Sequence, residues 1–217
     1  MVELFRKVYK FNNYIFDWSG TLVDDLGPVL DATNRVFNHY GKDSFTREGF
    51  CSEFCLPFKI FYDKFLPEVP MSELELLYTK FFNQSHENVF LLPGAKEILR
   101  ECSNLGIKTY LLSSIKKQHF ESQSAELGLS DFFDFAYTEA LDKRDWITRL
   151  LKDNNISHED TVFIGDMQHD IETARYAEVF SVGVLTGYNS KEMIERSNPD
   201  LIVNDLVELL EIIINKS

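Results

Sequence analysis

The sequence predicts an α/β fold in which a parallel sheet is covered by helices. Six short apolar segments lack the alternation of a half-exposed strand and are bounded by turn or polar residues, as in strands buried on both faces. Helical segments separate the later strands, an alternation typical of parallel βαβ units. The predicted strands are Tyr14–Phe16, Lys108–Leu112, Phe133–Tyr137, Thr161–Ile164, Phe180–Val184 and Leu201–Val203. The accompanying helices are Pro93–Asn104, Lys116–Leu127, Lys143–Asn155, Ile171–Ala177 and Leu206–Ile214.

One long interval after the first strand departs from this alternation. From about residue 26 to residue 88 the chain contains no segment typical of a strand, but helical spacing rich in phenylalanine recurs. The simplest interpretation is a helical domain inserted after the first strand, with the sheet resuming near Phe90. We therefore expect an α/β core of residues 1–25 and 89–217 and a helical domain of residues 26–88. The helical segments of this domain are Val29–Tyr40, Phe58–Phe65 and Ser72–Phe82.

The composition excludes several classes of protein. No apolar run approaches the roughly 20 residues that a bilayer-spanning helix needs, and residues 1–10 mix charged and apolar side chains without a signal-peptide core. The net charge of −13 argues against a nucleic-acid surface, which would need a basic patch. A small phosphorylated substrate is still compatible, because a bound cation and a few lysines can reverse the local field. The sequence does not indicate an oligomeric state.

The three cysteines of the chain cannot form a disulfide framework. Cys51 and Cys55 make a single C-x-x-x-C pair on an apolar segment, without the second pair that would complete a zinc site. We interpret them as buried thiols, which fit a reduced cytoplasm. We therefore expect a cytoplasmic protein with neither membrane nor nucleic-acid partners.

A carboxylate follows the first predicted strand directly. Asp17 is succeeded by Trp18 and then by Ser19-Gly20-Thr21. Open α/β sheets bind ligands at the carboxyl ends of their strands. The Ser-Gly-Thr segment predicts a tight turn whose backbone N–H groups can surround an anion. An ordinary Asp-containing loop is the alternative interpretation of this segment taken alone.

Hydroxyl groups and a lysine follow further along the chain. Ser113 and Ser114 come after the strand Lys108–Leu112, where a hydroxyl can donate to a phosphate oxygen. Lys143 stands at the start of a predicted helix. Taken singly, the serines are better explained as an ordinary polar strand end and Lys143 as a solvated surface charge, so their weight depends on what accompanies them.

Two carboxylates four residues apart follow the strand Thr161–Ile164. Asp166 and Asp170 flank the start of a helix, so both can face one hard cation. Mg²⁺ prefers one or two carboxylates together with substrate phosphate and water. Helix capping is the competing explanation for Asp170. Together, these polar groups at successive strand ends form a specific combination that could bind Mg²⁺ and a phosphate group.

The order of these groups resembles that of the haloacid dehalogenase-like hydrolases. Asp17 with Thr21, in D-x-x-G-T-L, matches the nucleophile motif; Ser113 matches the hydroxyl motif, Lys143 the lysine motif, and Asp166 with Asp170 the acidic motif. The resemblance covers nearly the whole chain and is strongest to the phosphoglycolate phosphatase-like branch. It implies a Rossmann-like parallel sheet core with an inserted α-helical cap domain.

The resemblance also implies a mechanism. The family's aspartate attacks phosphorus and forms an aspartyl-phosphate, which water then hydrolyses. Carried over to this chain, Asp17 is the nucleophile, and Lys143 with Mg²⁺ neutralises the repulsion between carboxylate and phosphate. Gly20, Thr21, Ser113, Ser114 and Lys143 are the phosphate-binding residues that it implies. The ligands implied for Mg²⁺ are Asp17, Asp166, Asp170 and the backbone carbonyl of Ser19.

Ser19 departs from the family pattern. The family's phosphatases usually have a second aspartate here, two residues after the nucleophile, which serves as general acid and base. Serine cannot do this near neutral pH, and a positioned acid–base group typically contributes about 10²–10⁴-fold. We favour a phosphatase that lacks its usual proton donor.

Several alternatives to that interpretation stay open. One is a slow or inactive phosphate-binding or regulatory member of the family, and another is a phosphotransferase with a long-lived aspartyl-phosphate. A phosphonate- or halide-cleaving relative is the third, although the two acidic-motif aspartates argue against metal-free dehalogenation.

Substrate contacts from the cap are the least defined part of the site. Arg47 and Lys59 are the candidates for binding a substrate anion, although such residues are more often solvated surface charges. Cys55-Leu56-Pro57 resembles the cap turn that approaches the site in relatives. We expect cap closure to exclude water, with hinges near Asp24–Gly27 and Asn88–Leu92.

Overall fold

The computed structural model describes residues 10–85 and 88–214. Residues 1–9, over which the sequence predicts no signal-peptide core, lie outside the described residues. The same holds for residues 86–87, inside the predicted helical domain, and for residues 215–217. Within the described part of the chain, no helix is long and apolar enough to cross a membrane.

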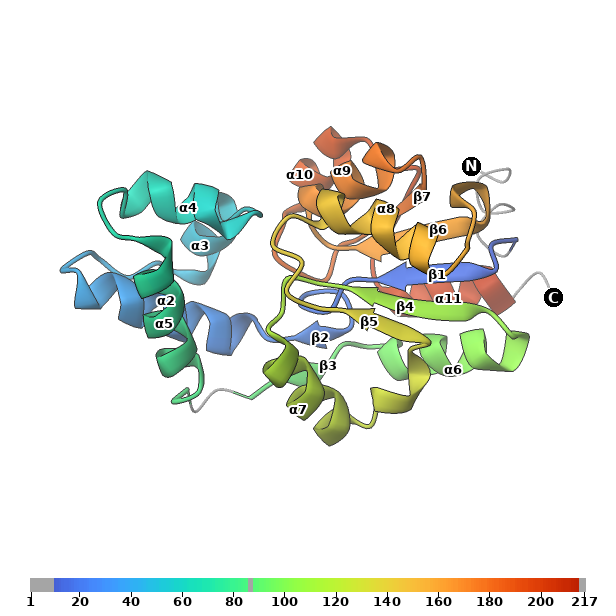
Figure 1. The fold of residues 1–217 in the computed structure, drawn as a ribbon, viewed down its shortest axis with the longest axis horizontal. Coiled ribbons are helices and arrows are strands. Elements are labelled where there is room, and N and C mark those ends of the chain that lie inside the picture. Colours follow the sequence, from blue (N-terminus) through green and yellow to red (C-terminus); the bar gives the residue numbers. More distant parts are fainter. Residues whose placement is uncertain (1–9, 86–87, 215–217) are drawn as a thin grey trace.

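The core is built on a six-stranded sheet in which every neighbouring pair is parallel (Figure 1). Its order is β5-β4-β1-β6-β7-β8, so the chain builds outward from the central strand β1 on both sides. The register places Phe16 of β1 opposite Leu111 of β4 and Ile164 of β6. The strands are β1 (Asn13–Phe16), β4 (Lys108–Leu112), β5 (Phe135–Tyr137), β6 (Thr161–Gly165), β7 (Phe180–Val184) and β8 (Leu201–Val203). The predicted α/β class is confirmed, and the strand bounds differ from the prediction by two residues at most.

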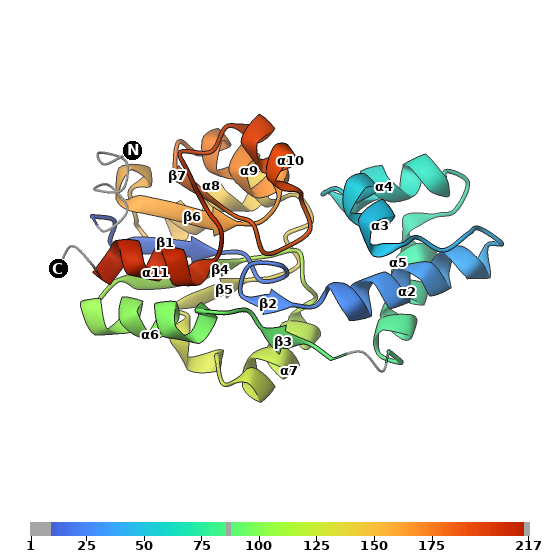
Figure 2. The same ribbon diagram turned by 180° about the vertical axis from the view of Figure 1, so that it is seen from behind.

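Helices cover both faces of this sheet, which explains the continuous apolar strand segments. On one face Tyr14 and Phe16 pack against α6 (Ala95–Leu105), α7 (Lys117–Leu127) and α11 (Leu206–Ile214). Figure 2 shows α11 lying beside α6 on this face. On the opposite face Ile15 and Phe163 pack with buried residues of α8 (Lys143–Asp153) and α9 (Gln168–Tyr176). Burial on both sides leaves the strand ends as the place where polar side chains can gather.

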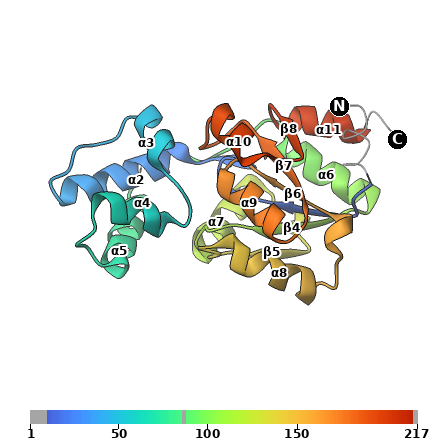
Figure 3. The same ribbon diagram turned by 90° about the horizontal axis from the view of Figure 1, so that it is seen from above.

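Four helices form the insertion that follows β1. They are α2 (Leu26–His39), α3 (Arg47–Glu53), α4 (Phe58–Phe65) and α5 (Met71–Phe82). Figure 3 shows them set to one side of the sheet. Their core is a phenylalanine cluster in which Phe37, Phe50 and Phe61 are almost fully buried. The phenylalanines of this segment therefore form the core of the insertion. The exact division of the chain into domains stays a prediction.

The chain enters and leaves the insertion through a short two-stranded ribbon. Strand β2 (Val23–Asp24) pairs antiparallel with β3 (Phe90–Leu91). The prediction that the sheet resumes near Phe90 is therefore wrong. Strand β3 pairs with β2, which follows the turn after Asp17, and not with a strand of the main sheet. The predicted hinge segments lie at this ribbon and next to it.

Two short α-helices among the described residues were absent from the prediction. These are α3 and α10 (Lys191–Ser197), each only seven residues long. Thr46 caps the first of them, and Ser190 caps the second by accepting from the backbone N–H of Met193. Helices this short show barely two turns of periodicity, which is too little to distinguish them from a loop by spacing.

Candidate active site

Asp17 lies at the carboxyl end of the central strand, between the ends of β4 and β6. Its backbone N–H donates to the carbonyl of Ile164 at 3.0 Å, which continues the ladder between β1 and β6 by one residue. The connections of the chain run to opposite sides of the sheet from β1, so Asp17 occupies the crevice where such sheets bind ligands. Its side chain is almost completely buried.

Lys143 reaches Asp17 from the first residue of α8. Its ammonium Nζ lies 2.8 Å from Asp17 Oδ1 and 2.6 Å from Asp170 Oδ1, and the side chain is fully buried. The backbone N–H of Lys143 donates to Nε2 of His169 at 3.1 Å. Burial, followed by the charge of Lys143, lowers the pKa of His169 to about 4, so this imidazole is a neutral acceptor that holds the start of α8. Arg144, the next residue, pairs instead with Asp142.

Asp166 follows β6 and is held by two donors. The hydroxyl of Thr21 donates to its Oδ1 at 3.0 Å, and the backbone N–H of Tyr188 donates to its Oδ2 at 2.7 Å. Gly20, at φ +75°, and Gly187 both approach this carboxylate so closely that an added Cβ would overlap it. These glycines therefore let two backbone segments close around Asp166.

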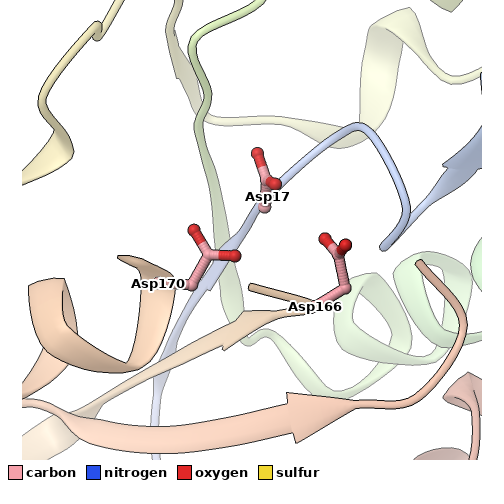
Figure 4. A group of neighbouring side chains, drawn as sticks. All are labelled: Asp17, Asp166 and Asp170. Carbon is pink, nitrogen blue, oxygen red and sulfur yellow. The ribbon is translucent and has the colours of Figure 1, made fainter. Parts of the chain in front are cut away.

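Asp170 completes the group from the first turn of α9. Its Oδ2 accepts from the backbone N–H of Met167 at 3.0 Å, while its Oδ1 faces Lys143. The capping interpretation of Asp170 is thus correct for one oxygen, and the second oxygen is directed at the site. Figure 4 shows Asp17, Asp166 and Asp170 converging, and one oxygen from each lies within 4.8 Å of the others.

The charges of this cluster fit a divalent cation. Three carboxylates face one lysine, which leaves a formal charge of −2 in a buried space. Burial raises the pKa of Asp17 despite the nearby ammonium. Burial, and then the charges of Asp17 and Asp170, raise the pKa of Asp166 well above its usual range. Asp17 Oδ1 has the ammonium nearby but no aligned hydrogen bond. A set of hard oxygen donors with excess negative charge is what Mg²⁺ prefers.

The predicted phosphate-binding hydroxyls lie at the end of β4. Ser113 is buried, and both it and Ser114 line the cavity that contains Asp17. The predicted role of the turn after Asp17 receives less support. Gly20 N–H donates to Val23 at 2.8 Å and Thr21 N–H to Trp18 at 3.3 Å, so these amides are engaged within the turn.

Ser19 takes part in a hydrogen-bond chain that the sequence did not indicate. Its Oγ donates to Asp25 Oδ2 at 2.6 Å, and the hydroxyl of Tyr188 donates to Asp25 Oδ1 at 2.9 Å. Asp25 is buried, and burial raises its pKa to about 6 even though both hydrogen bonds act in the opposite direction. The Asp25 carboxylate is therefore hydrogen-bonded to the side chain of Ser19, which occupies the position where the family's phosphatases usually have their second aspartate.

The cavity above these residues lies between the core and the inserted helices. It measures about 250 Å³, with Asp17, Ser19 and Asp25 among its lining residues. We call it the cap–core cleft. Leu56, in the turn that resembles the family's cap turn, also lines it.

Arg47 and Lys59 are not among the residues that line the cap–core cleft. Arg47 begins α3 and is exposed. Lys59 is exposed on α4, where it pairs with Asp63 one turn further on. The structure therefore gives no support to the prediction that these residues contact substrate. They lie on solvent-facing sides of their helices, a property that spacing alone did not reveal.

Residues missed by the sequence interpretation include Asp25, Tyr188 and Lys116. All three line the cap–core cleft. Asp25 belongs to the adjacent pair Asp24-Asp25, which is the only local signal it gives. Its contact with Ser19 depends on the turn that brings the chain back over β1, and Tyr188 lies 163 residues away from it in the chain.

The comparisons with known proteins agree with this geometry. The family model described as "Haloacid dehalogenase-like hydrolase" matches residues 14–184. A phosphoglycolate phosphatase of Photobacterium profundum is 24% identical over 91% of this chain and 93% of its own length. A pyrophosphatase of Bacillus mycoides is 24% identical over 94% of this chain and 97% of its own. A haloacid dehalogenase-like hydrolase structure from Streptococcus pneumoniae superimposes with a TM-score of 0.83 at 21% identity, covering 93% of this chain and 97% of the other.

The chain belongs to the haloacid dehalogenase-like hydrolases, because the family model covers most of its length. The relatives confirm the resemblance to the phosphoglycolate phosphatase-like branch. They also confirm the predicted enzyme class, a hydrolase of the phosphatase type. The predicted Rossmann-like core is also confirmed.

Proposed function

We propose that this chain is a Mg²⁺-dependent phosphatase that hydrolyses a small phosphorylated metabolite through an aspartyl-phosphate on Asp17. The observation that carries the proposal is the buried cluster of Asp17, Asp166 and Asp170, in which the ammonium of Lys143 pairs with Asp17 and Asp170. Relatives named phosphoglycolate phosphatase and pyrophosphatase support phosphoryl chemistry in general. The cytoplasmic location expected from the cysteines stays a prediction.

The first step transfers the phosphoryl group to the protein. A carboxylate oxygen of Asp17 attacks phosphorus, a bond forms between them, and the bond between phosphorus and the leaving oxygen breaks with its electrons on that oxygen. Lys143 Nζ, 2.8 Å from Asp17, lowers the repulsion between the carboxylate and the phosphate dianion. In the second step water attacks the same phosphorus and regenerates the Asp17 carboxylate. Catalysis then consists mainly of positioning and charge stabilisation.

Mg²⁺, held by Asp17, Asp166, Asp170 and the Ser19 carbonyl, would supply charge neutralisation and orient the phosphate. The chain prepares this site with its own contacts. Thr21 and the Tyr188 N–H fix Asp166, while the Met167 N–H fixes one oxygen of Asp170. The second oxygen of Asp170 pairs with Lys143 and would also contribute its charge to the metal.

The hydroxyls after β4 would hold the phosphoryl oxygens. Ser113 is 1% exposed, and its Oγ accepts a long contact of 3.4 Å from the N–H of Ile115. No described residue accepts its hydroxyl proton, which is therefore available for a phosphate oxygen. Ser114 and Lys116 follow it on the cleft wall. They are candidates for the remaining phosphate contacts.

The hydrogen bond from Ser19 to Asp25 limits the acid–base chemistry that residue 19 can perform. The Ser19 proton is directed at Asp25, so Ser19 Oγ is left to accept hydrogen bonds from the cleft. It can position the attacking water by accepting from it, but it offers no proton to a departing alkoxide. We therefore expect slow hydrolysis of alkyl phosphates and faster hydrolysis of esters with good leaving groups.

The test is phosphate release from an activated aryl phosphate and from small alkyl phosphates, with Mg²⁺ and with a chelator. We expect wild type to hydrolyse the aryl ester only with Mg²⁺ and Asp17→Asn to be inactive, because Asn cannot attack phosphorus. An active Asp17→Asn variant would contradict the assignment of the nucleophile.

The same hydrogen bond supports a second candidate function, a regulatory or slow member of the family that retains bound phosphate. In that case wild type with Mg²⁺ would bind phosphate and hydrolyse no ester, whereas Ser19→Asp would hydrolyse alkyl phosphates. Such a pattern would show an intact scaffold in which turnover is suppressed at residue 19.

A further inference from the structure

The walls of the cap–core cleft are largely apolar and aromatic. The inserted helices and the turn between them contribute Phe54, Phe58, Tyr62, Leu74, Tyr78 and Phe82. Tyr188 enters from the core side and packs against Phe54 with ring centroids 5.6 Å apart. Such walls favour an apolar or aromatic group over a hydrated one, because burying apolar surface is favourable and burying an unpaired polar group is costly.

Charged residues of the cleft lie mostly on the core side. Among the described lining residues that the four inserted helices contribute, the only charged one is Glu75 of α5. Lys116 follows Ser113 and Ser114 on the loop after β4, the same strand end that faces Asp17. Lys116 is therefore contributed by the strand end that also carries Ser113 and Ser114, whereas the helices of the insertion contribute a carboxylate to the cleft lining. On the side of the inserted helices, a second anionic group on the substrate would meet Glu75 and no lining cation among the described residues.

The acid–base position limits the leaving group independently of the walls. Because the Ser19 proton is directed at Asp25, the leaving oxygen receives no proton from this residue. An aromatic alcohol leaves as a stabilised phenolate that needs no protonation in the transition state, whereas an alkoxide does. Wall chemistry and leaving-group chemistry thus favour the same type of ester.

We propose that the substrate is a phosphate monoester of an aromatic alcohol that carries no second anionic group, with its ring between the aromatic residues of the cap–core cleft and its phosphate at Asp17. This inference rests on the proposed function. Asp17 attacks phosphorus, the bond from phosphorus to the phenolic oxygen breaks, and the phenolate takes its proton from solvent. Water then releases inorganic phosphate from Asp17.

Binding of non-hydrolysable analogues tests the substrate class separately from turnover. Phenylphosphonate carries the ring, and phosphonoacetate carries a second anion; both would be titrated calorimetrically into the Mg²⁺-loaded protein. We expect phenylphosphonate to bind at least about tenfold more tightly, within the range that a few apolar contacts provide. Equal binding, tighter binding of phosphonoacetate, or binding of neither would overturn the proposal.

Kinetics with matched variants provide the second test. In wild type, kcat/KM for phenyl phosphate should exceed that for phosphoglycolate, and Glu75→Arg should raise the value for phosphoglycolate by about tenfold. Leu76→Arg, on the same helix but 71% exposed, is the control and should change neither value. Phe58→Ala should lower kcat/KM for phenyl phosphate, whereas Ile60→Ala, 57% exposed on the same helix, should not.

The outcomes separate the two proposals. If no ester is hydrolysed but phenylphosphonate binds preferentially, the phosphatase function fails and the ligand class holds. If phosphoglycolate is hydrolysed at least as efficiently as phenyl phosphate, the phosphatase function holds and the aromatic substrate class is wrong. If Glu75→Arg and Leu76→Arg behave alike, Glu75 does not select against a second anion, and this part of the proposal is overturned.

Discussion

Removal of Mg²⁺ should measurably destabilise the folded protein, because the site gathers more negative charge than it can balance itself. The carboxylates of Asp17, Asp166 and Asp170 lie together with the ammonium of Lys143, which pairs with Asp17 and Asp170, so the formal charge of the group is −2. Burial raises the pKa values of Asp17 and Asp166, so ionising them in the metal-free protein opposes folding. A cation that binds only the folded state relieves this repulsion.

The size of the effect follows from linkage. At a Mg²⁺ concentration 100 times the dissociation constant, binding to the folded state adds about 2.7 kcal/mol to the free energy of unfolding. A change of 1 kcal/mol moves the midpoint of thermal unfolding by roughly 2–4 °C in a chain of this length. We therefore expect Tm to rise by about 5–11 °C between chelator and saturating Mg²⁺.

The assay is thermal unfolding followed by circular dichroism, with Mg²⁺ or with a chelator. Asp166→Asn should lose most of the Mg²⁺-dependent rise in Tm, because it removes one charged ligand. Asp43→Asn, an exposed substitution outside the site, is the control and should retain the full rise. If wild type shows no rise, or if Asp166→Asn shows the same rise as wild type, the reasoning about this cluster is refuted.

Three further predictions concern single positions. Ser19→Asp should raise kcat for alkyl phosphates by about 10²–10⁴-fold with little change for aryl phosphates; equal gains on both in steady-state assays would show that leaving-group protonation is not what residue 19 limits. Gly187→Ala should abolish the Mg²⁺-dependent rise in Tm, because its Cβ would overlap Asp166, and an unchanged rise would contradict that. Burial, and then the charge of Lys116, lowers the pKa of His119 below 6.5, so its contribution to stability is present above pH 6.5 and is lost as the pH falls through the folded-state pKa. The free energy of unfolding in urea should be measured above pH 6.5 and at a pH below the folded-state pKa of His119. Its decrease between the two should be smaller for His119→Gln than for wild type, and equal decreases would contradict this assignment.

The α/β core was predictable because its signals are local. Apolar segments such as Thr161–Ile164 read as strands, and Lys143–Asn155 shows a regular helical spacing that nearly coincides with α8. The short helix α3 was missed because seven residues show too little periodicity. Phe90 was assigned to the main sheet because sequence shows that a segment is extended but not which strand pairs with it.

The candidate site was predictable only where a residue belongs to a motif at a strand end. Asp17 and Asp166 follow strands that the sequence predicts, and parallel strands bring such ends together. Asp25 acts through the hydroxyl of Ser19, a contact that depends on the path of the turn and gives no signal in spacing. Arg47 and Lys59 were chosen for their charge, and which side of a helix faces the cleft depends on how the insertion packs against the core.

The measurement that tests the central claim most directly is rapid acid quenching during turnover of an activated aryl phosphate, followed by mass spectrometry of the peptide that contains Asp17. The account predicts a phosphorylated peptide with the modification on Asp17 in wild type and its absence in Asp17→Asn. Turnover without a phosphorylated peptide, or phosphorylation at another residue, would contradict the aspartyl-phosphate mechanism.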